Sequence, residues 1–302
     1  MCIFLGEQMY KLVIESSERA FLPEIRAYVE YFRRNEFEVV VAERREYLPS
    51  DFDVALLFHG FHPFWSEYPP VVVGEYHSLS VGRFGRVKDF VKRLLNVRSD
   101  LYVFLSGDMR RYMWFLESVR CAYRPMGHYS TTSERNQYAQ KRYDVVYSGS
   151  IRPGVRETIL YLAELGLTVA VVGEGGGLSH GNVTCFGRLD VLGSYEVIIQ
   201  AKYGLNITPD IFPLNVQDST KVVEYCALGL GVITNRYSWI NGFELARGGR
   251  FLDISSVKDR SDVKEFDFIV PSVSDLEWSV VMNRSGIAEK LKSLLVNGRY
   301  FE

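Results

Sequence analysis

The chain has 302 residues, which is long for one compact domain and sufficient for two of about 130–160 residues each. Its 47% apolar and 24% charged residues are typical of a globular protein, and its net charge of −2 indicates no nucleic-acid partner. Its four scattered cysteines argue against a disulfide scaffold or a structural zinc site. No apolar run reaches membrane-spanning length and the N-terminus lacks the features of a signal peptide, so we expect a cytoplasmic protein that is at most attached to a membrane surface.

The first half of the chain alternates short apolar runs with helical patterns. Runs rich in Val and Leu predict buried strands, and apolar residues spaced three or four apart predict helices. In chain order, the pattern predicts a strand at 11–15, a helix at 19–35, strands at 38–42, 53–58 and 71–75, a helix at 85–97, a strand at 101–105, a helix at 109–119 and a strand at 121–123. Such alternation is typical of a parallel sheet covered on both faces.

The second half repeats this alternation after a polar segment at 130–142, which we interpret as a linker. Strands are predicted at 144–148, 168–172, 183–186, 203–207 and 231–235, and helices at 156–164, 194–201, 219–228 and 285–296. The sequence therefore predicts an N-terminal Rossmann-like domain over 1–130, a second over 143–285, and a C-terminal helix over 286–302 that can pack back on the first. Ligands of such sheets bind beyond the carboxyl ends of the strands.

The helix predicted at 219–228 carries the densest group of chemically useful residues. Asp218 or Ser219 is a suitable N-cap, and the free N–H groups of the first turn suit a diphosphate. Lys221 lies in that turn, where a cation is unfavourable for the helix dipole unless an anion binds there. Glu224 follows one turn later on the same face and can accept hydrogen bonds from ribose hydroxyls. The alternative is a plain surface ion pair between Lys221 and Glu224.

This segment reads S-T-K-V-V-E-Y-C-A-L-G-L-G-V-I from Ser219 to Ile233 and resembles the helix of retaining GT-B glycosyltransferases, glycosyl transferases group 1. Further segments at 147–154, 171–175 and 182–187 are similar to loops and strands of the same family, as is the strand at 71–77 that ends in His77. The likeness is collinear over about residues 53–253. It implies a GT-B fold, in which two Rossmann-like domains face each other across a cleft.

The resemblance implies roles for individual residues. Lys221 and Arg152 would bind the donor diphosphate, Glu224 the ribose, and His77 would lie near the transferred sugar, so that His77, Lys221 and Arg152 are the candidate catalytic residues. The nucleobase would lie against 173–175 and near Arg188. The remaining donor-binding candidates are Gly149, Ser150, Gly173, Glu174, Gly175, Ser219 and Thr220. Many family members have a Glu eight residues before the ribose carboxylate, where this chain has Val216.

The same resemblance implies a reaction without cofactor or metal, because these enzymes use Lys and Arg on the leaving phosphate. Asp51 and Asp53 have the D-x-D spacing of a metal site, but they precede an apolar strand and are interpreted as a turn and a strand start. A retaining reaction needs no strong protein base. An inverting one would need His77, His59 or Asp53.

Two segments of the first half are candidates for acceptor binding. His59, His62 and Trp65 lie in a loop after a predicted strand, where contact with a sugar is weighed against aromatic packing and a metal site. Arg83 and Arg86 begin a segment that is rich in cations: ten Lys and Arg stand against four Asp and Glu over 83–124. Its interleaved apolar residues predict an amphipathic helix. This helix either packs on its sheet, or docks on an anionic lipid surface through 83–98 and serves a lipid-linked acceptor.

The leading hypothesis is therefore a hexosyltransferase that uses a nucleotide-sugar donor and a glycan, lipid or other acceptor. Two alternatives stay open at this point. One is a non-catalytic protein of the same fold that binds sugar nucleotides or glycans, and the other is a GT-B sugar-nucleotide 2-epimerase.

Overall fold

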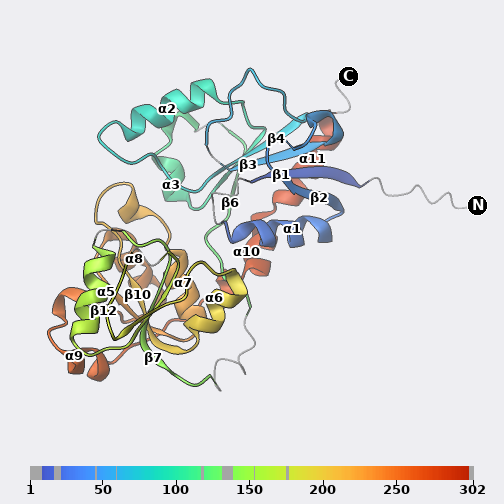
Figure 1. Cartoon of the computed structure of the whole chain (residues 1–302). Helices are drawn as coiled ribbons and strands as arrows, with labels where there is room; N and C mark the ends of the chain where they lie inside the picture. Colours follow the sequence, from blue (N-terminus) through green and yellow to red (C-terminus); the bar gives the residue numbers. More distant parts are fainter. Residues whose placement is uncertain are drawn as a thin grey trace, which may run out of the picture. The chain divides into compact units, whose positions relative to one another are not determined.

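The computed structural model describes residues 9–16, 22–44, 46–58, 60–116, 119–130, 139–152, 154–174 and 177–298. It consists of two compact units (Figure 1), one formed by Met1–Pro125 with Trp278–Glu302 and the other by Met126–Glu277. The two Rossmann-like sheets predicted from the sequence are both present. None of the described helices is both long and apolar enough to cross a membrane.

The first unit is built on a six-stranded sheet in the order β2-β1-β3-β4-β5-β6, in which all neighbouring strands are parallel. Its strands are β1 (Tyr10–Glu15), β2 (Phe37–Ala42), β3 (Val54–Phe58), β4 (Val71–Tyr76), β5 (Leu101–Phe104) and β6 (Cys121–Tyr123). Its helices are α1 (Glu24–Arg34), α2 (Gly85–Leu95), α3 (Gly107–Arg111), α10 (Trp278–Ser285) and α11 (Ile287–Gly298), with 3-10 turns η1 (Pro49–Asp51) and η2 (Trp114–Leu116). The strands β4 and β5 are buried along their whole length, which explains the apolar runs Val71–Val73 and Leu101–Phe104.

The second unit has a six-stranded parallel sheet in the order β12-β11-β10-β7-β8-β9. Its strands are β7 (Tyr143–Ser148), β8 (Val169–Val172), β9 (Val183–Cys185), β10 (Ala201–Asn206), β11 (Gly231–Thr234) and β12 (Leu252–Asp253). Its helices are α5 (Val155–Glu164), α6 (Val191–Ile198), α7 (Thr220–Ala227), α8 (Ser238–Arg247) and α9 (Arg260–Glu265), with 3-10 turns η3 (Leu214–Val216), η4 (Ile254–Ser256) and η5 (Ser274–Leu276). The strand order reverses between β7 and β10, which makes this the switch point where ligands of such sheets bind.

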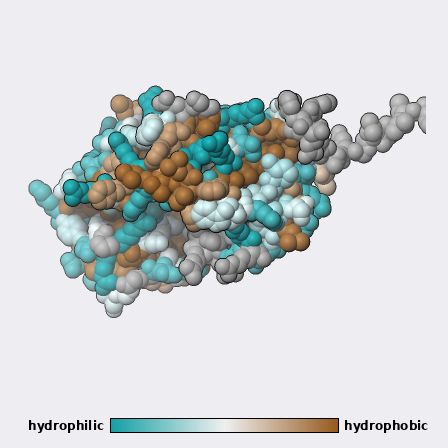
Figure 2. Space-filling model, turned by 90° about the horizontal axis from the view of Figure 1, so that it is seen from above, coloured by the Kyte–Doolittle hydropathy of each residue, from teal (hydrophilic) through white to brown (hydrophobic). Residues whose placement is uncertain are grey.

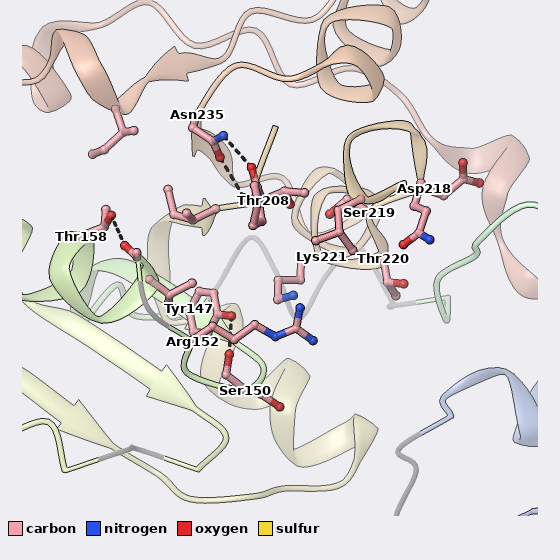
Figure 3. A pocket seen from close by; sticks show the side chains of 17 residues that line it. Tyr147, Ser150, Arg152, Thr158, Thr208, Asp218, Ser219, Thr220, Lys221 and Asn235 are labelled. Atoms are coloured by element: carbon pink, nitrogen blue, oxygen red, sulfur yellow. Dashed lines mark hydrogen bonds between the residues drawn. The ribbon is translucent and has the colours of Figure 1, made fainter. Parts of the chain in front are cut away.

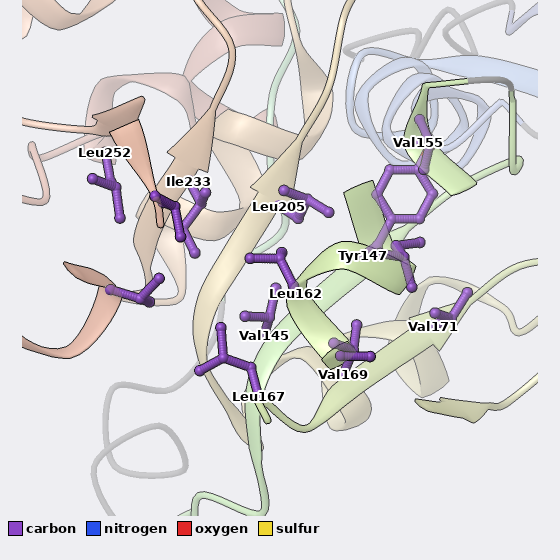
Figure 4. Close-up of a cluster of buried hydrophobic side chains, with 14 residues drawn as sticks. Val145, Tyr147, Val155, Leu162, Leu167, Val169, Val171, Leu205, Ile233 and Leu252 are labelled. Atoms are coloured by element: carbon purple, nitrogen blue, oxygen red, sulfur yellow. The ribbon is translucent and has the colours of Figure 1, made fainter. Parts of the chain in front are cut away.

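The core of the second unit lies between α5 and its sheet (Figure 4). Val145 and Tyr147 from β7, Leu162 from α5 and Leu205 from β10 are among the buried side chains that meet there. This burial removes from water the apolar faces that the helix and the strands present, and it fixes the carboxyl ends of β7 and β10 side by side. The loops that follow these two strands therefore meet at one place.

Several predicted elements differ from the structure. The helix predicted at 109–119 begins earlier, because Ser106 accepts a hydrogen bond from the N–H of Met109 at 3.1 Å, and it ends at Arg111 before a separate 3-10 turn. The helix predicted at 194–201 lies at 191–198, because Asp190 caps it through the N–H of Gly193 at 2.7 Å. The elements α8, α9, β12 and α10 were not predicted from the sequence.

The second domain boundary also differs from the prediction, which placed 278–285 in the C-terminal domain. The helix α10 belongs to the first unit, where it packs against α1. Its first residue, Trp278, is buried with its ring 5.1 Å from the guanidinium of Arg124, which comes after β6. This aromatic contact holds the end of the chain on the first unit.

Candidate functional site

The second unit has a pocket of about 600 Å³ at its switch point (Figure 3). It is formed by the loop after β7, the loops after β10 and β11, and the N-terminus of α7. Five of the predicted site residues line it, namely Ser150, Arg152, Ser219, Thr220 and Lys221, together with Tyr147, Gly154, Val155, Thr158, Ile207, Thr208, Pro209, Leu214, Gln217, Asp218, Asn235 and Ile254. All of these residues belong to one unit, so the pocket is complete within it.

The N-terminus of α7 is held at this pocket by a buried polar network. The hydroxyl of Ser219 donates to Oδ1 of Asn206 at 3.0 Å, and its oxygen accepts from the N–H of Val222 as the helix cap. The amide of Asn206 donates in turn to Thr234 and Tyr237, both at 3.0 Å. Because Asn206 ends β10 and Thr234 ends β11, the two strand ends set the position of the helix.

Lys221 and Arg152 point their cationic groups into the same part of the pocket (Figure 3). Neither of them forms an ion pair with any residue that the structure describes. The ammonium of Lys221 lies 5.5 Å from the centre of the Tyr147 ring. Burial is the main cause of the lowered pKa of Lys221; Glu224 acts against it, and the neighbouring guanidinium of Arg152 adds a smaller lowering effect. Two like charges that converge without a direct ion pair to the described residues form a site for an anion.

Gly149 supplies the close approach that this arrangement needs. It has a φ of +136°, and a Cβ added there would lie 2.8 Å from Cε of Lys221. Gly173 lies next to it and has a φ of +128°. A Cβ added at Gly173 would clash with the carbonyl oxygen of Gly149, at a distance of 2.3 Å. Gly149, predicted near the diphosphate, and Gly173, predicted near the nucleobase, therefore bring the ends of β7 and β8 together beside the ammonium.

Glu224 does not form the surface ion pair with Lys221 that the sequence left as an alternative. No such pair is found among the residues of 139–152, 154–174 and 177–298. The carboxylate instead accepts a hydrogen bond from the hydroxyl of Tyr195 at 3.3 Å. Burial raises the pKa of Glu224 to about 7, against the lowering effects of Lys221 and Tyr195. A half-buried carboxylate with one remaining free oxygen can accept further hydrogen bonds from a ligand.

The residues predicted to contact the nucleobase lie at the ends of β8 and β9. Gly173 and Gly187 form an isolated bridge, in which the N–H of Gly173 donates to the carbonyl of Gly187 at 2.7 Å. Glu174 and Arg188 are exposed on either side of this bridge and do not line the pocket. Gly175 lies outside the described residues.

His77 lies in the first unit, in a cluster of buried charges. Its Nδ1 is 3.0 Å from Oε1 of Glu24, and its Nε2 is 2.5 Å from Oε1 of Glu75. Glu75 is also bound by the fully buried guanidinium of Arg124, whose Nε donates to it at 2.9 Å. Burial lowers the pKa of His77, but the two carboxylates outweigh it and raise the pKa to about 9. The ring is therefore a cation at neutral pH with both nitrogens engaged, which argues against its use as a general base.

The other candidates of the first unit are dispersed. His62 contacts the carbonyl of Phe58 at 2.8 Å through Nε2 and lies near Glu15, so it anchors its loop. Asp53 accepts a hydrogen bond from the N–H of Lys11 at 2.8 Å, at the amino end of β3, opposite to the edge where ligands bind. His59 lies outside the described residues. Trp65, Arg83 and Arg86 are exposed, and the guanidinium of Arg83 lies 5.8 Å from the centre of the Phe84 ring.

Sequence reasoning missed the residues that support the site. Tyr147, Tyr195 and Asn206 contact Lys221, Glu224 and Ser219, and each lies far from its partner in the sequence. Asn235 was also missed: it joins two pocket loops through hydrogen bonds of 2.9 and 2.7 Å to the backbone of Thr208. Their placement at or just after strand ends is a signal that could have identified Asn206 and Asn235.

No protein-family model matches the chain. No curated protein matches it in sequence either. Its fold, in contrast, is similar to that of several solved structures. Sucrose-phosphate synthase from Thermosynechococcus elongatus matches with a TM-score of 0.58 and 12% identity, over 97% of this chain and 100% of that one. AviGT4, a glycosyltransferase involved in avilamycin A biosynthesis, matches with a TM-score of 0.54 and 12% identity, over 95% of this chain and 97% of that one.

An α-glucosyltransferase in complex with UDP and a 13-mer DNA is a third similar structure, with a TM-score of 0.53 and 9% identity, over 96% of this chain and 100% of that one. These similarities cover nearly the whole length of each chain, and both units contribute to them. Together with the two parallel six-stranded sheets, they show that the chain has the GT-B fold that its sequence predicts.

Proposed function

We propose that the chain is a metal-independent glycosyltransferase that moves a hexose from a nucleoside-diphosphate sugar to a glycan, a lipid or another acceptor. The observation that carries the proposal is the convergence of Lys221 and Arg152, neither of which forms a direct ion pair with the described residues, at the N-terminus of α7. A diphosphate satisfies both cations and the free N–H groups of the first helical turn.

The same groups suit the chemical step. When the bond between the sugar and the diphosphate breaks, negative charge develops on the β-phosphate, and fixed cations in a partly dry pocket stabilise that charge. Glu224 would bind the ribose, and the loops that carry Gly173 and Arg188 would hold the base. The raised pKa of His77 makes it unsuitable as the base of an inverting reaction, whereas retention needs no protein base because the leaving phosphate takes up the acceptor proton.

A screen of nucleotides and nucleotide sugars tests the proposal. UDP, GDP, ADP and CMP derivatives are added at saturation while thermal unfolding is recorded. A donor at about 100 times its Kd should stabilise the protein by about 2.7 kcal/mol. If none of them raises the melting temperature, the assignment of the pocket is wrong.

Product analysis with the stabilising compound then separates the alternatives. A transferase releases the nucleoside diphosphate at a rate that depends on an acceptor. A 2-epimerase forms an isomeric nucleotide sugar without any acceptor, and a non-catalytic binding protein leaves the compound unchanged. Formation of the isomer would therefore contradict the proposed transfer reaction but would leave the assignment of the pocket intact.

The affinity for the donor should rise with pH through about 7, because burial raises the pKa of Glu224 to that value in the free protein. Below it, the protonated carboxyl loses part of its capacity to accept hydrogen bonds from ribose hydroxyls, and above it the carboxylate accepts fully. Titration calorimetry with an intact nucleotide sugar, whose phosphates do not titrate in this range, measures the effect.

Glu224→Gln is the matched control for this prediction. The amide has a similar shape and no titration, so the variant should bind weakly at every pH, with no inflection near neutrality. An unchanged inflection in the variant would show that another group titrates, and the ribose role of Glu224 would be withdrawn.

A further inference from the structure

Helix α2 of the first unit is turned the opposite way from an ordinary amphipathic helix. Its apolar residues face solvent: Phe84, directly before the helix, is 64% exposed, and Val87 and Leu94 are 58% and 61% exposed. Among the helical residues, only Gly85 and Asp89 are fully buried. A helix that packs on its own sheet would bury the apolar stripe and expose the polar one.

Polar contacts on the inner face hold the helix in this orientation. The carboxylate of Asp89 accepts hydrogen bonds from the N–H of Ser80 at 3.0 and 3.2 Å, and Lys92 donates to the Ser80 hydroxyl at 3.2 Å. At the end of the helix, the amide of Asn96 bonds the backbone of His62 and Gly60, both at 3.0 Å. Because these groups are spaced along one side of the helix, the opposite, apolar side must point outward.

The exposed apolar surface extends beyond the helix (Figure 2). The figure views this side of the molecule and shows hydrophobic residues gathered into one patch with hydrophilic residues at its margin. Trp114 stacks on Phe90 of α2 with ring centres 5.6 Å apart, and the N–H of Phe64 donates to the carbonyl of Leu95 at 2.9 Å. Two exposed tryptophans, Trp65 and Trp114, thus flank α2. Tryptophan is favoured where an apolar surface meets the polar boundary of a bilayer.

The charge of this surface identifies its partner. Of the six Lys and Arg in residues 81–98, Arg83, Arg86, Lys88 and Arg98 are exposed, whereas Lys92 and Arg93 are partly buried on the inner side. The one acid of this segment, Asp89, is buried and bound to Ser80. A second copy of the chain would bring like charges together across such an interface, which is unfavourable. An anionic bilayer takes up the apolar side chains and neutralises the cations around them.

We propose that α2, together with the aromatic residues Phe64, Trp65 and Trp114, is a docking surface for an anionic lipid bilayer. The helix lies in the plane of the headgroups, with Phe84, Val87, Val91 and Leu94 toward the acyl chains. This inference does not depend on the proposed transfer reaction, since it involves no residue of the pocket in the second unit.

Vesicle flotation of the full-length protein tests the proposal. Vesicles of phosphatidylcholine alone are compared with an equimolar mixture of phosphatidylcholine and phosphatidylglycerol. The protein should float with the anionic vesicles, float far less with the neutral ones, and be released by salt. A protein that stays in solution with both kinds of vesicle would overturn the proposal.

Two variants separate the apolar and the electrostatic contributions. Val87→Ser with Leu94→Ser should weaken binding at least about tenfold, because two side chains no longer leave water. Arg83→Gln with Lys88→Gln should weaken it about fivefold per removed cation, which corresponds to about 1 kcal/mol each. The matched control is Leu245→Ser, which alters an 86% exposed leucine on α8 and should bind like the unchanged protein.

The competing occupant is a second copy of the chain. Analytical ultracentrifugation of the unchanged protein and of the double variant Val87→Ser/Leu94→Ser decides between a bilayer and a second copy as the occupant. A dimer that dissociates in the variant, combined with no flotation, would assign the surface to self-association and reject the membrane. If the variant Arg83→Gln with Lys88→Gln bound anionic vesicles as well as the unchanged protein does, the membrane proposal would also be rejected, since it requires the cations.

Discussion

Replacing Lys221 by Ala should lower the affinity for the nucleotide-sugar donor by about 10–100-fold, because a hydrogen bond to a charged group contributes about 1.5–3 kcal/mol. The loss in turnover should exceed the loss in affinity, since the charge on the β-phosphate grows in the transition state and its stabilisation depends on the same ammonium. Titration calorimetry and initial rates with saturating donor measure the two effects separately.

The stability of the free protein distinguishes this role from a structural one. Burial and the neighbouring Arg152 disfavour the charge of Lys221, while Glu224 favours it, so its removal should change the melting temperature little. Lys264→Ala, an exposed lysine of α9 that does not line the pocket, is the control and should change neither binding nor turnover. Unchanged donor affinity in Lys221→Ala would show that the pocket has been assigned wrongly.

Replacing Arg124 by Met should destabilise the first unit by about 3–5 kcal/mol, the usual cost of removing one partner of a buried ion pair. Both Arg124 and Glu75 are completely buried, and the guanidinium also lies 5.4 Å from the ring of Tyr28 and 5.1 Å from that of Trp278. Without it, His77 is the one cationic partner that Glu75 keeps among the residues that the structure describes. The variant should also loosen α10, because its first residue packs on the guanidinium.

Urea unfolding measures this loss, with near-ultraviolet circular dichroism to report on Trp278. The two units can unfold separately, so the transition of the first unit must be resolved before a free energy is taken from it. Arg111→Met is the control: this arginine pairs with Asp108 on the surface, where such pairs contribute about 0–1 kcal/mol. An Arg124 variant no less stable than the Arg111 variant would contradict the importance given to the buried pair.

Most strands of both sheets could be predicted because their apolar runs are local features of the sequence. A strand buried on both faces, such as β5 or β8, needs an uninterrupted series of apolar residues, whatever it packs against. Two of the elements that were missed have weaker local patterns. The strand β12 has only two residues, and the helix α9 has six, of which one is buried. Such short elements depend on neighbours that the sequence does not identify.

The N-terminus of α7 was predictable for the same local reason. A capping residue at Ser219, a lysine in the first turn and a glutamate three residues later are recognisable from spacing alone, and the structure places them as a capped helix end at the switch point. What spacing could not show is that Lys221 and Glu224 are not paired with each other. That follows from Tyr195, which lies 29 residues from the carboxylate that it bonds.

The first unit shows the limit of local reasoning most clearly. The periodicity of α2 predicts an apolar face and a cationic face, but periodicity carries no information about which of them turns inward. The orientation of the helix is fixed by Ser80 and by the loop around His62, which form hydrogen bonds with its polar side. In the same way, the sequence suggests that His77 is a free catalytic side chain, whereas in the structure Glu24 and Glu75 contact its two nitrogens.

Local sequence thus determines the alternation of strands and helices and the chemistry of the α7 terminus, because backbone geometry and capping act over a few neighbouring positions. The pairing of charges and the direction in which α2 faces were decided only by the folded chain, because they depend on residues that crossover connections bring together from distant parts of the sequence. A buried charge or an apolar stripe has a strong physical preference for a partner, but the sequence does not say which partner the fold supplies.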